Sequence, residues 1–489
     1  MTADAQKNGG AKPKLDFTTF DNVINGKLVN TTKTRHNINP STLEPNPEVP
    51  IATLDDVNEA VKHARTAAKG WATTPLADRR QAILNLAAAL RETAPEFARM
   101  LTKEQGKPLS MALGEAEGSS QLLEQIAKLP FDDDIVEDSE THVVKTRYVP
   151  LGVAVAIVPW NFPHNLACIK LGHAVVTGNT VIIKPSPFTP YCNLKLAELA
   201  QQFFPPGVVQ ALSGDDSLGP WLTEHEGVDK VSFTGSTATG RLVMKSCAKT
   251  LKRVTLELGG NDAAIGFEDV DVADTAAKLA QFAFINSGQI CIAVKRIYVH
   301  ASIYPQFLEA FVATTKSLRV GDGMTEGVFL GPVQNKMQYD RISGLLKDVQ
   351  ETKGTIAFGG NDGADGTMGK GYFIQPTVVD NPPDTSRIVM EEPFGPIVPL
   401  LEFDTEEEAI TRANSSDYGL GGSVWSKDLP RAERVASQLQ AGNIWVNSHM
   451  VIRPDAPVAG HKQSGIGVEF GTSGLRGFCN PQTITVPKA

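Results

Sequence analysis

The stretch that decides the fold is residues 152–184, GVAVAIVPWNFPHNLACIKLGHAVVTGNTVIIK. It begins and ends with apolar, β-branched runs, 152–158 and 180–184, which have the length of strands buried on both faces. Further runs of this kind, separated by helical stretches, follow at 208–212, 230–234 and 253–257. The alternation predicts a parallel sheet covered by helices on both faces, the layout typical of dinucleotide-binding domains.

The segments outside this block have patterns of their own. Residues 54–105 carry apolar residues at helical spacing, so we expect helices there. The polar and then alternating segment 132–152 favours a hairpin. A second series of strand-like runs lies at 296–300, 396–403, 421–426 and 442–447.

We therefore predict an α/β protein with two domains and a small β extension. A Rossmann-like parallel-sheet domain for a cofactor takes residues 1–131 and 151–256. A second α/β domain takes residues 257–460. The extension combines the hairpin at 132–150 with the terminal segment 472–489, whose strand QTITVP has no partner nearby in the sequence.

Composition and charge exclude several functions. The chain has 489 residues, a formal net charge of −9 and no block of Lys and Arg, so we expect neither nucleic acid nor an anionic membrane as a partner. No apolar run approaches the ~18 residues of a membrane span. The 5 cysteines form no close pair, which indicates reduced thiols in the cytoplasm and no zinc site. The first 15 residues resemble no targeting signal and are expected to form a loose tail.

Cys291 is the first candidate for chemistry. It lies between two isoleucines in FINSGQICIAVKR, residues 284–296. Such a cysteine is most often a buried structural thiol. Gly288 and Gln289 favour a reactive one, because glycine permits the tight, strained backbone found beside nucleophiles. The residues alone leave both interpretations open.

Two polar residues follow predicted strands of the first sheet, where ligands bind in such folds. Glu257 ends the strand 253–257, and desolvation there would raise its pKa toward the range of a general base. The alternative is a carboxylate paired with a nearby Lys or Arg. Asn161 follows the strand 152–158, where it would donate to an oxyanion or form an Asx turn before Pro163.

A glycine-rich loop and a lysine are candidates for holding a phosphate and a ribose. The loop FTGSTATG, residues 233–240, opens a helix whose first backbone amides can bind phosphate. It lacks the G-x-G-x-x-G fingerprint, and Arg241 stands where a P-loop requires lysine, so a plain glycine-rich turn is the alternative. Lys184 ends the strand 180–184 and would either reach ribose hydroxyls or be solvated.

The ordered series PWNFP, KPSP, FTGSTATG, LELGGND, GQIC, EEPFGP and HKQSGIGVEFG resembles the aldehyde dehydrogenase superfamily over nearly the whole chain. The resemblance implies NAD(P)+-dependent oxidation of an aldehyde to a carboxylic acid through a cysteine thiohemiacetal and a thioester, followed by hydrolysis. It also implies that the first domain binds NAD(P), that the second is catalytic, and that the extension joins subunits into a homodimer or homotetramer.

The resemblance assigns roles to individual residues. Cys291 would be the nucleophile, Asn161 would form the oxyanion hole with the backbone N–H of Cys291, and Glu257 would activate water. Lys184 would hold the adenosine ribose, and Glu392 the nicotinamide ribose. The residues expected to contact the cofactor are Trp160, Lys184, Ser186, Gly235, Ser236, Glu392 and Phe394. The apolar residues expected to line the substrate pocket are Phe162, Leu166, Ile169, Ile290, Ile292 and Val458.

The chain departs from the family pattern at three places. Pro187 replaces a glutamate that binds the adenosine ribose in many NAD-preferring members, so both NAD and NADP are expected to fit. The pair at 261–262, Asn-Asp, stands where lysine and serine are common and should leave the catalytic step intact. Val458 replaces an aromatic residue, which favours an open pocket for an uncharged aliphatic or aromatic aldehyde. Two alternatives remain: a semialdehyde gripped by Arg453, and CoA-acylating chemistry, against which Glu257 argues.

Overall fold

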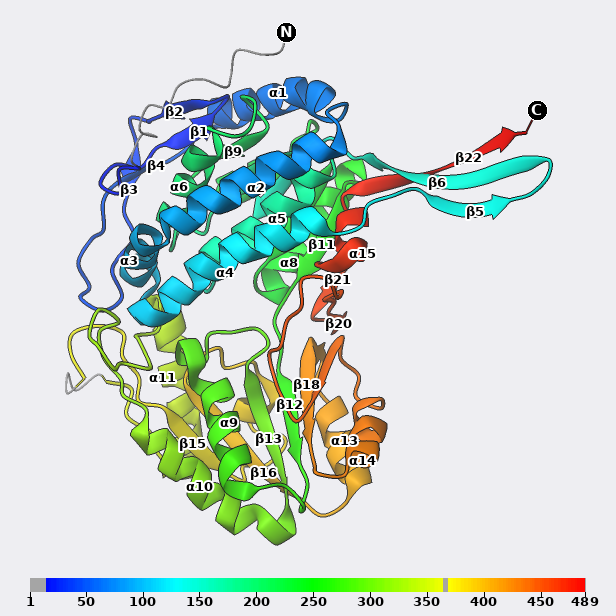
Figure 1. Ribbon diagram of the computed structural model, residues 1–489. Coiled ribbons are helices and arrows are strands. Elements are labelled where there is room, and N and C mark those ends of the chain that lie inside the picture. The colour runs from blue at the N-terminus through cyan, green and yellow to red at the C-terminus, as the bar shows by residue number, and fades with distance from the viewer. Residues whose placement is uncertain (1–14, 364–367, 489) are drawn as a thin grey trace.

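The computed structural model describes residues 15–363 and 368–488. Figure 1 shows an upper lobe built from the N-terminal half, a lower lobe built from later residues, and an arm that projects to one side. The predicted loose tail lies outside the described residues except for Leu15. No helix in the described part of the chain is long and apolar enough to cross a membrane.

The upper lobe is built on an eight-stranded sheet in the order β2-β1-β9-β8-β7-β10-β11-β21. Its centre is parallel, and antiparallel strands close both edges, with β1 beside β9 and β21 beside β11. The central strands are buried on both faces, which is why the sequence shows them as continuous apolar runs. The bounds are β1 (Asn22–Ile24), β2 (Lys27–Val29), β7 (Val153–Ile157), β8 (Thr180–Lys184), β9 (Val209–Ala211), β10 (Lys230–Thr234), β11 (Arg253–Glu257) and β21 (Gly465–Ile466).

The lower lobe contains a seven-stranded sheet in the order β14-β15-β16-β13-β12-β18-β19. All of its pairings are parallel except that of β14 with β15. The bounds are β12 (Asp262–Gly266), β13 (Val294–His300), β14 (Thr355–Phe358), β15 (Thr377–Asp380), β16 (Ile397–Phe403), β18 (Gly421–Trp425) and β19 (Asn443–Val446). Two such sheets confirm the predicted α/β class.

Helices cover both faces of the first sheet. The region 54–105 forms three helices, α1 (Leu54–Trp71), α2 (Leu76–Glu92) and α3 (Ala94–Gln105), and a capping box at Thr53 starts the first of them. One apolar cluster lies under α2–α6 on one face, and a second lies under α1, α7 and α8 on the other. The other helices around this sheet are α4 (Leu109–Lys128), α5 (Pro163–Val176), α6 (Tyr191–Ala200), α7 (Leu218–Glu224), α8 (Thr237–Cys247) and α15 (Gly471–Arg476).

Helices also cover the second sheet, and short elements complete the chain. The helices are α9 (Val272–Phe284), α10 (Tyr304–Ser317), α11 (Lys336–Glu351), α12 (Arg387–Met390), α13 (Glu406–Asn414) and α14 (Leu429–Ala436). The short elements are β3 (Thr34–Arg35), β4 (Val49–Pro50), β17 (Tyr418–Gly419), β20 (His461–Lys462), η1 (Ala248–Thr250), η2 (Ile285–Gly288) and η3 (Ala301–Ile303).

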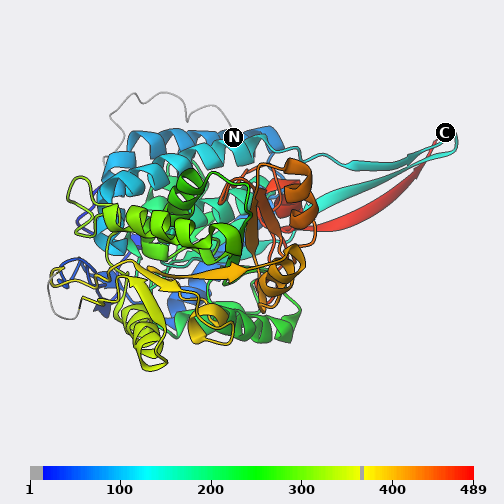
Figure 2. The same cartoon turned by 90° about the horizontal axis from the view of Figure 1, so that it is seen from below.

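The arm is a three-stranded antiparallel sheet in the order β22-β6-β5. It combines the predicted hairpin, β5 (Asp134–Asp138) and β6 (His142–Pro150), with the terminal strand β22 (Cys479–Pro487). The pairing of β22 with β6 runs from Cys479 opposite Pro150 to Pro487 opposite His142. The terminal strand therefore finds its partner within the same chain, and Figure 2 shows the arm extending well away from both lobes.

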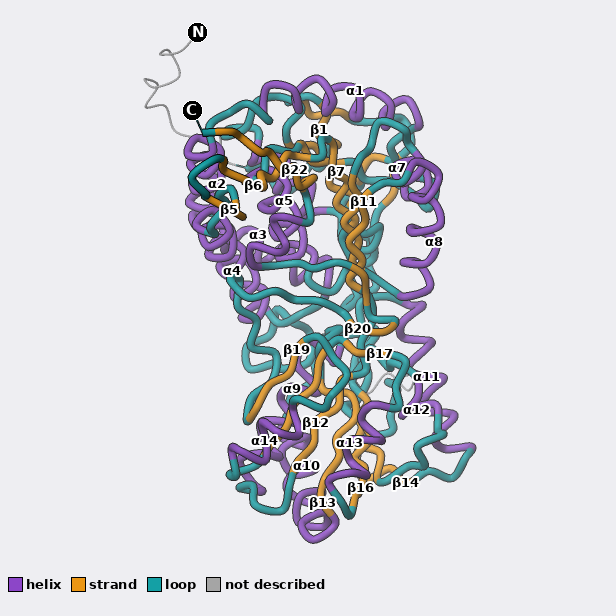
Figure 3. Tube along the Cα trace, turned by 90° about the vertical axis from the view of Figure 1, so that its right-hand side faces the viewer, coloured by secondary structure: helices purple, strands orange, loops and turns teal. Residues whose placement is uncertain are grey.

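The two lobes meet at a layer of loops. Figure 3 shows the first sheet above, the second below and irregular chain between them. The loops after β7 and β11 lie in this layer, since the residues that follow these strands hydrogen-bond to the lower lobe. The carboxyl ends of the first sheet thus face the second lobe, as expected for a ligand site in an open parallel sheet.

Candidate active site

The turn before Cys291 has a strained backbone. Asn286, Ser287 and Gly288 all adopt left-handed φ angles, 53°, 56° and 71°. A β-carbon at Gly288 would lie 2.2 Å from the carbonyl oxygen of Gly395, so this position has room for glycine alone. We call residues 286–291 the cysteine turn. The strain at non-glycine residues is typical of a functional site, and Gly288 was the signal for it in the sequence.

Cys291 differs from the other cysteines in its exposure. It is half-buried, whereas Cys168, Cys192, Cys247 and Cys479 are buried. Burial raises the pKa of the Cys291 thiol to about 12, and the charge of Lys295 opposes this rise. The thiol is therefore protonated near neutral pH, so forming the thiolate requires a group that takes its proton.

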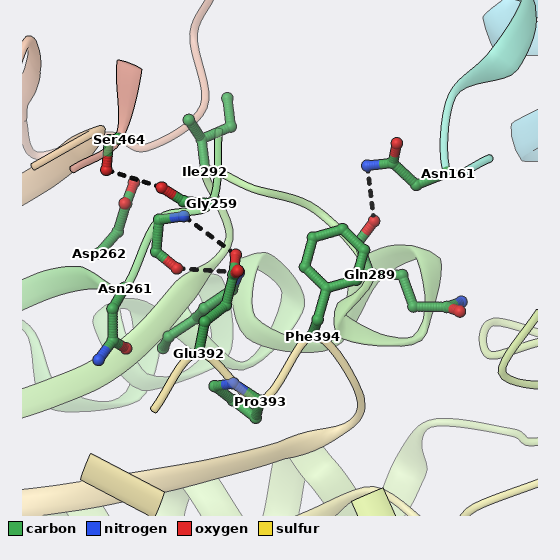
Figure 4. Close-up of polar contacts among 12 residues, drawn as sticks. Asn161, Gly259, Asn261, Asp262, Gln289, Ile292, Glu392, Pro393, Phe394 and Ser464 are labelled. Atoms are coloured by element: carbon green, nitrogen blue, oxygen red, sulfur yellow. Dashed lines mark hydrogen bonds and ion pairs between the residues drawn. The ribbon is translucent and has the colours of Figure 1, made fainter. Parts of the chain in front are cut away.

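Asn161 lies beside the cysteine turn. Its side-chain amide donates to the carbonyl oxygen of Gln289 at 3.0 Å, as Figure 4 shows. A primary amide has two N–H donors, and this bond uses one of them. The contact holds the Asn161 side chain against Gln289, which is two residues before Cys291 in the sequence. The second N–H of the amide is left for another acceptor.

A buried ion pair fixes the segment that carries Asn161. Lys107 and Glu115 form a pair whose side chains are 0% and 1% exposed. Lys107 donates to the backbone carbonyl of Asn161 at 2.9 Å, while Glu115 accepts the backbone N–H groups of His164 and Asn165. The pair thus fixes the backbone of Asn161 and the start of α5. Neither residue was predicted from the sequence.

Glu257 ends β11 with its carboxyl group buried. Its Oε1 has no hydrogen-bond partner among the described residues. Burial raises the pKa of Glu257 well above its usual value, the nearby charge of Glu469 raises it further, and Lys170 opposes both. Glu469 itself is ion-paired with Lys170 and accepts from Ser232 at 3.0 Å. Among the described residues Glu257 forms no ion pair, so the alternative of a carboxylate paired with a nearby Lys or Arg does not hold; the nearby Lys170 bonds to Glu469.

The adenosine side of the candidate cofactor site lies at the ends of β8 and β10. Lys184 is half-buried, and burial lowers the pKa of its amine to about 8. Ser236 is exposed and caps α8 by accepting the N–H of Thr239. Three predicted contacts are already engaged locally: Gly235 donates its N–H to the backbone carbonyl of Glu257, the hydroxyl of Ser186 accepts from the N–H of Phe188, and the amine of Lys184 donates to the carbonyl of Pro185.

The nicotinamide side is formed by the loop at Glu392 and Phe394. The Phe394 ring contacts Trp160 edge-on, with 5.3 Å between centroids. Glu392 accepts the N–H of Gly260 at 3.0 Å and pairs with Lys295 at 2.6 Å. Figure 4 shows this loop beside the 259–262 turn, with Asn161 on the other side of Phe394. Lys295, a charged residue in an apolar strand, was not predicted.

These groups fit a dinucleotide. Lys184 can donate to one ribose, the free amides at the start of α8 can bind a pyrophosphate, and Glu392 can accept from the hydroxyls of a second ribose. A β-carbon at Gly259 would lie 2.4 Å from Glu392 Oε2, so glycine leaves this oxygen accessible. A cavity of about 190 Å³ is lined by Glu392, Arg341, Tyr418 and Gln463, among others.

The predicted substrate-pocket residues fall into two groups. Phe162, Leu166, Ile292 and Val458 are half-buried, as expected for side chains that border a pocket. Ile169 and Ile290 are only 1% and 8% exposed, and Ile169 packs in the core of the upper lobe. Arg453 is 70% exposed and pairs with Asp455, so it is a solvated arginine in this structure.

The fold and the site together define a dinucleotide-dependent oxidoreductase with a cysteine at its centre. The chain belongs to the aldehyde dehydrogenase family, whose model matches residues 28–484. Aldehyde dehydrogenase LUC3 of a Fusarium species is 40% identical, covering 97% of this chain and 100% of its own. Phenylacetaldehyde dehydrogenase of Pseudomonas fluorescens is 34% identical, with 95% of each chain covered. The NAD+ complex of a Bacillus cereus aldehyde dehydrogenase superposes with a TM-score of 0.93 at 34% identity, covering 98% of this chain and 100% of that one.

The comparisons confirm the resemblance, the class of enzyme and the cofactor class. The protein is an NAD(P)-dependent aldehyde dehydrogenase, and NAD and NADP both remain compatible with it.

Proposed function

We propose that this enzyme oxidises an uncharged aldehyde to the free carboxylic acid, with Cys291 as nucleophile and Glu257 as general base. The supporting observation is the arrangement around the cysteine turn: a half-buried cysteine, an asparagine amide bonded to the same turn, and the buried carboxyl of Glu257, which has an unengaged oxygen and whose charge acts on Cys291. These three groups suffice for covalent addition, charge stabilisation and hydrolysis.

In the first half of the reaction, the Cys291 sulfur bonds to the aldehyde carbon. The thiol proton leaves for a base, and the carbonyl oxygen takes the negative charge of a tetrahedral thiohemiacetal. The free N–H of Asn161 and the backbone N–H of Cys291 donate to this oxyanion. NAD(P)+, when bound, would supply the acceptor for the hydride that the substrate carbon loses, and the acyl group stays on Cys291 as a thioester. Glu392 and Phe394 would hold the nicotinamide end, and Lys184 would hold the adenosine ribose.

In the second half, Glu257 removes a proton from a water molecule that attacks the thioester. The carbon–sulfur bond breaks, the acid leaves, and the sulfur of Cys291 is restored. The raised pKa of Glu257 suits this step, because a carboxylate with a raised pKa is a stronger base. The net reaction consumes aldehyde, NAD(P)+ and water and yields acid, NAD(P)H and a proton.

The substrate class follows from the pocket residues. The half-buried residues proposed to border the pocket, Phe162, Leu166, Ile292 and Val458, are all apolar. The alternative of a semialdehyde held by Arg453 is disfavoured, because Arg453 is solvated and already paired with Asp455. An uncharged aliphatic or aromatic aldehyde is therefore the best match.

Product analysis tests the proposal. Purified enzyme is incubated with each cofactor and a panel of aliphatic, aromatic and carboxylate-bearing aldehydes, with and without CoA. We expect the free acid and reduced cofactor in equal amounts, no requirement for CoA, and a higher kcat/KM for the uncharged aldehydes. A product that is an acyl-CoA formed only when CoA is present would contradict the hydrolytic role of Glu257.

We further propose that the arm joins subunits into a homodimer or homotetramer in the cytoplasm. The arm exposes Ile135, Val136 and Val486, which are 59%, 66% and 46% accessible. A thin sheet with exposed apolar residues is stabilised by covering them with another surface. All five cysteines are free thiols, which supports a location in the reducing environment of the cytoplasm. Residues 1–131 and 151–256 are assigned to the NAD(P) domain, 257–460 to the catalytic domain, and 132–150 with 472–489 to this assembly.

Sedimentation velocity tests the proposed assembly. The double variant Ile135→Asp/Val136→Asp places two charges on the arm, and we expect it to sediment as a smaller species than the wild type. Leu251→Asp is the matched control, since Leu251 is 87% exposed and lies outside the arm. A wild-type protein that sediments as a monomer would refute the assembly.

A further inference from the structure

Lys295 is a buried cation that the proposed reaction steps do not use. It lies on the segment that follows Cys291, and its side chain is 3% exposed. A lysine that is taken out of water needs a counter-ion and hydrogen-bond acceptors to offset its desolvation. The positions of those partners show what this residue can do.

A β-bulge directs the side chain of Lys295. In the pairing of β12 with β13, Asp262 lies opposite Val294 and Ala263 lies opposite Arg296. Lys295 is therefore the extra residue, which takes no partner in the ladder. Bulges re-aim side chains and are frequent beside active sites. Without the bulge, regular alternation along β13 would set the direction of Lys295.

The amine of Lys295 contacts both residues proposed for the nicotinamide side. Its Nζ lies 2.6 Å from Glu392 Oε1 and 4.8 Å from the centre of the Phe394 ring. It also donates to the carbonyl oxygen of Gly260 at 3.3 Å. One side chain thus joins the segment of the nucleophile to the loop that would hold the nicotinamide half of the cofactor.

The two carboxylate oxygens of Glu392 have different surroundings. Oε1 accepts from both Lys295 and the N–H of Gly260, so its position is fixed. Within residues 15–363 and 368–488, no hydrogen bond engages Oε2, and Gly259 leaves space around it. The fixed oxygen sets the direction of the second one, and Glu392 is one of the residues that line the cavity described above.

We propose that Lys295 is a positioning residue for the nicotinamide half of the cofactor. It anchors Glu392 through Oε1, so that Oε2 meets the ribose hydroxyls, and it packs against Phe394, which would lie beside the ring. This inference rests on the proposed function of Glu392 and Phe394. The charge of Lys295 also opposes the rise in the pKa of Cys291, so the same residue acts on the nucleophile.

Binding measurements test this role without relying on turnover. Lys295→Met removes the charge and keeps most of the side-chain length. We expect its Kd for the preferred cofactor, NAD+ or NADP+, to rise roughly tenfold or more, because hydrogen bonds to charged groups contribute about 1.5–3 kcal/mol. The Kd for the adenosine half alone, 5′-AMP or 2′,5′-ADP, should not change, since Lys184 holds that half. Lys295→Arg should restore much of the cofactor affinity.

A double-mutant cycle separates positioning from a structural role. In a Glu392→Gln background, Lys295→Met should add little to the Kd for the cofactor, because its partner is already changed. Lys195→Met is the matched control: Lys195 is a 2% exposed lysine paired with Glu198, remote from the proposed site. If Lys295→Met is not recovered folded, Lys295→Gln should show the same pattern.

The outcomes are distinct. The inference would be overturned if Lys295→Met left the cofactor Kd unchanged, or if it raised the Kd values of the cofactor and of the adenosine half equally. It would also be overturned if the effects of Lys295→Met and Glu392→Gln on the cofactor Kd were additive, or if Lys195→Met raised that Kd as much as Lys295→Met does. A wild-type enzyme that binds the cofactor but oxidises no aldehyde would refute the proposed function and leave the binding comparison intact.

Discussion

Cys291→Ala is expected to abolish aldehyde oxidation, lowering kcat by at least about 10⁴-fold, because no other group can form the thioester. The burst of reduced cofactor on mixing enzyme with aldehyde should also disappear, since the covalent adduct precedes electron transfer. Rapid-mixing absorbance of the reduced cofactor measures both. Cofactor binding should persist, because the thiol is not a proposed cofactor contact.

Cys168→Ala is the matched control for this variant. Cys168 lies on α5, the helix that follows Asn161, but its side chain is fully buried in the core and burial raises the pKa of its thiol. The Cys168→Ala variant should still oxidise the aldehyde. After brief exposure to an aldehyde, mass spectrometry should still detect the adduct on Cys291. Loss of the adduct in Cys168→Ala, or its persistence in Cys291→Ala, would place the nucleophile elsewhere.

Glu257→Gln is expected to produce one burst of reduced cofactor per active site and then to stall. The thioester still forms, but its hydrolysis lacks a base, so steady-state turnover should fall by roughly 10²–10⁴-fold. Mass spectrometry should detect the acyl group on Cys291. A variant that turns over at the wild-type rate after the burst would show that another group activates water.

The pH dependence of hydrolysis provides a second check on Glu257. Only its carboxylate form can accept a proton, so wild-type hydrolysis should increase as pH rises through the raised pKa of this group. The charge of Glu469 contributes to that rise. Glu469→Gln should therefore lower the pKa of Glu257 and shift the profile toward lower pH. A profile that moves toward higher pH would contradict the assigned electrostatics.

The first sheet was predictable because its strands are short apolar runs in a regular order with helices. The runs at 152–158, 180–184 and 253–257 contain the strands β7, β8 and β11. In the second sheet, β12 was missed, because its sequence DAAIG has little β-branched character. The edge strands of both sheets are short, and their pairing depends on distant segments.

The candidate site was predictable only in part, because some of its residues have local signals in the sequence and others do not. Cys291, Glu257 and Asn161 stand at strand ends or beside glycines, which are local signals in the sequence. The ion pairs that support them have no such signal. Lys295 and Glu392 are 97 positions apart, and Lys170 and Glu469 are separated by 299. Each pair lies within one lobe, and only the tertiary fold of that lobe brings its two partners together.

The close approach of Gly288 to Gly395 has a consequence for how this enzyme can change. The two main chains touch here with no side chain between them, so the spacing from sulfur to nicotinamide loop depends on this backbone contact as well as on the side chain of Lys295. Exchanging side chains at the pocket border can then alter which aldehyde enters without disturbing that spacing. Libraries that seek new substrates should vary Phe162, Leu166 and Val458 and leave both glycines untouched.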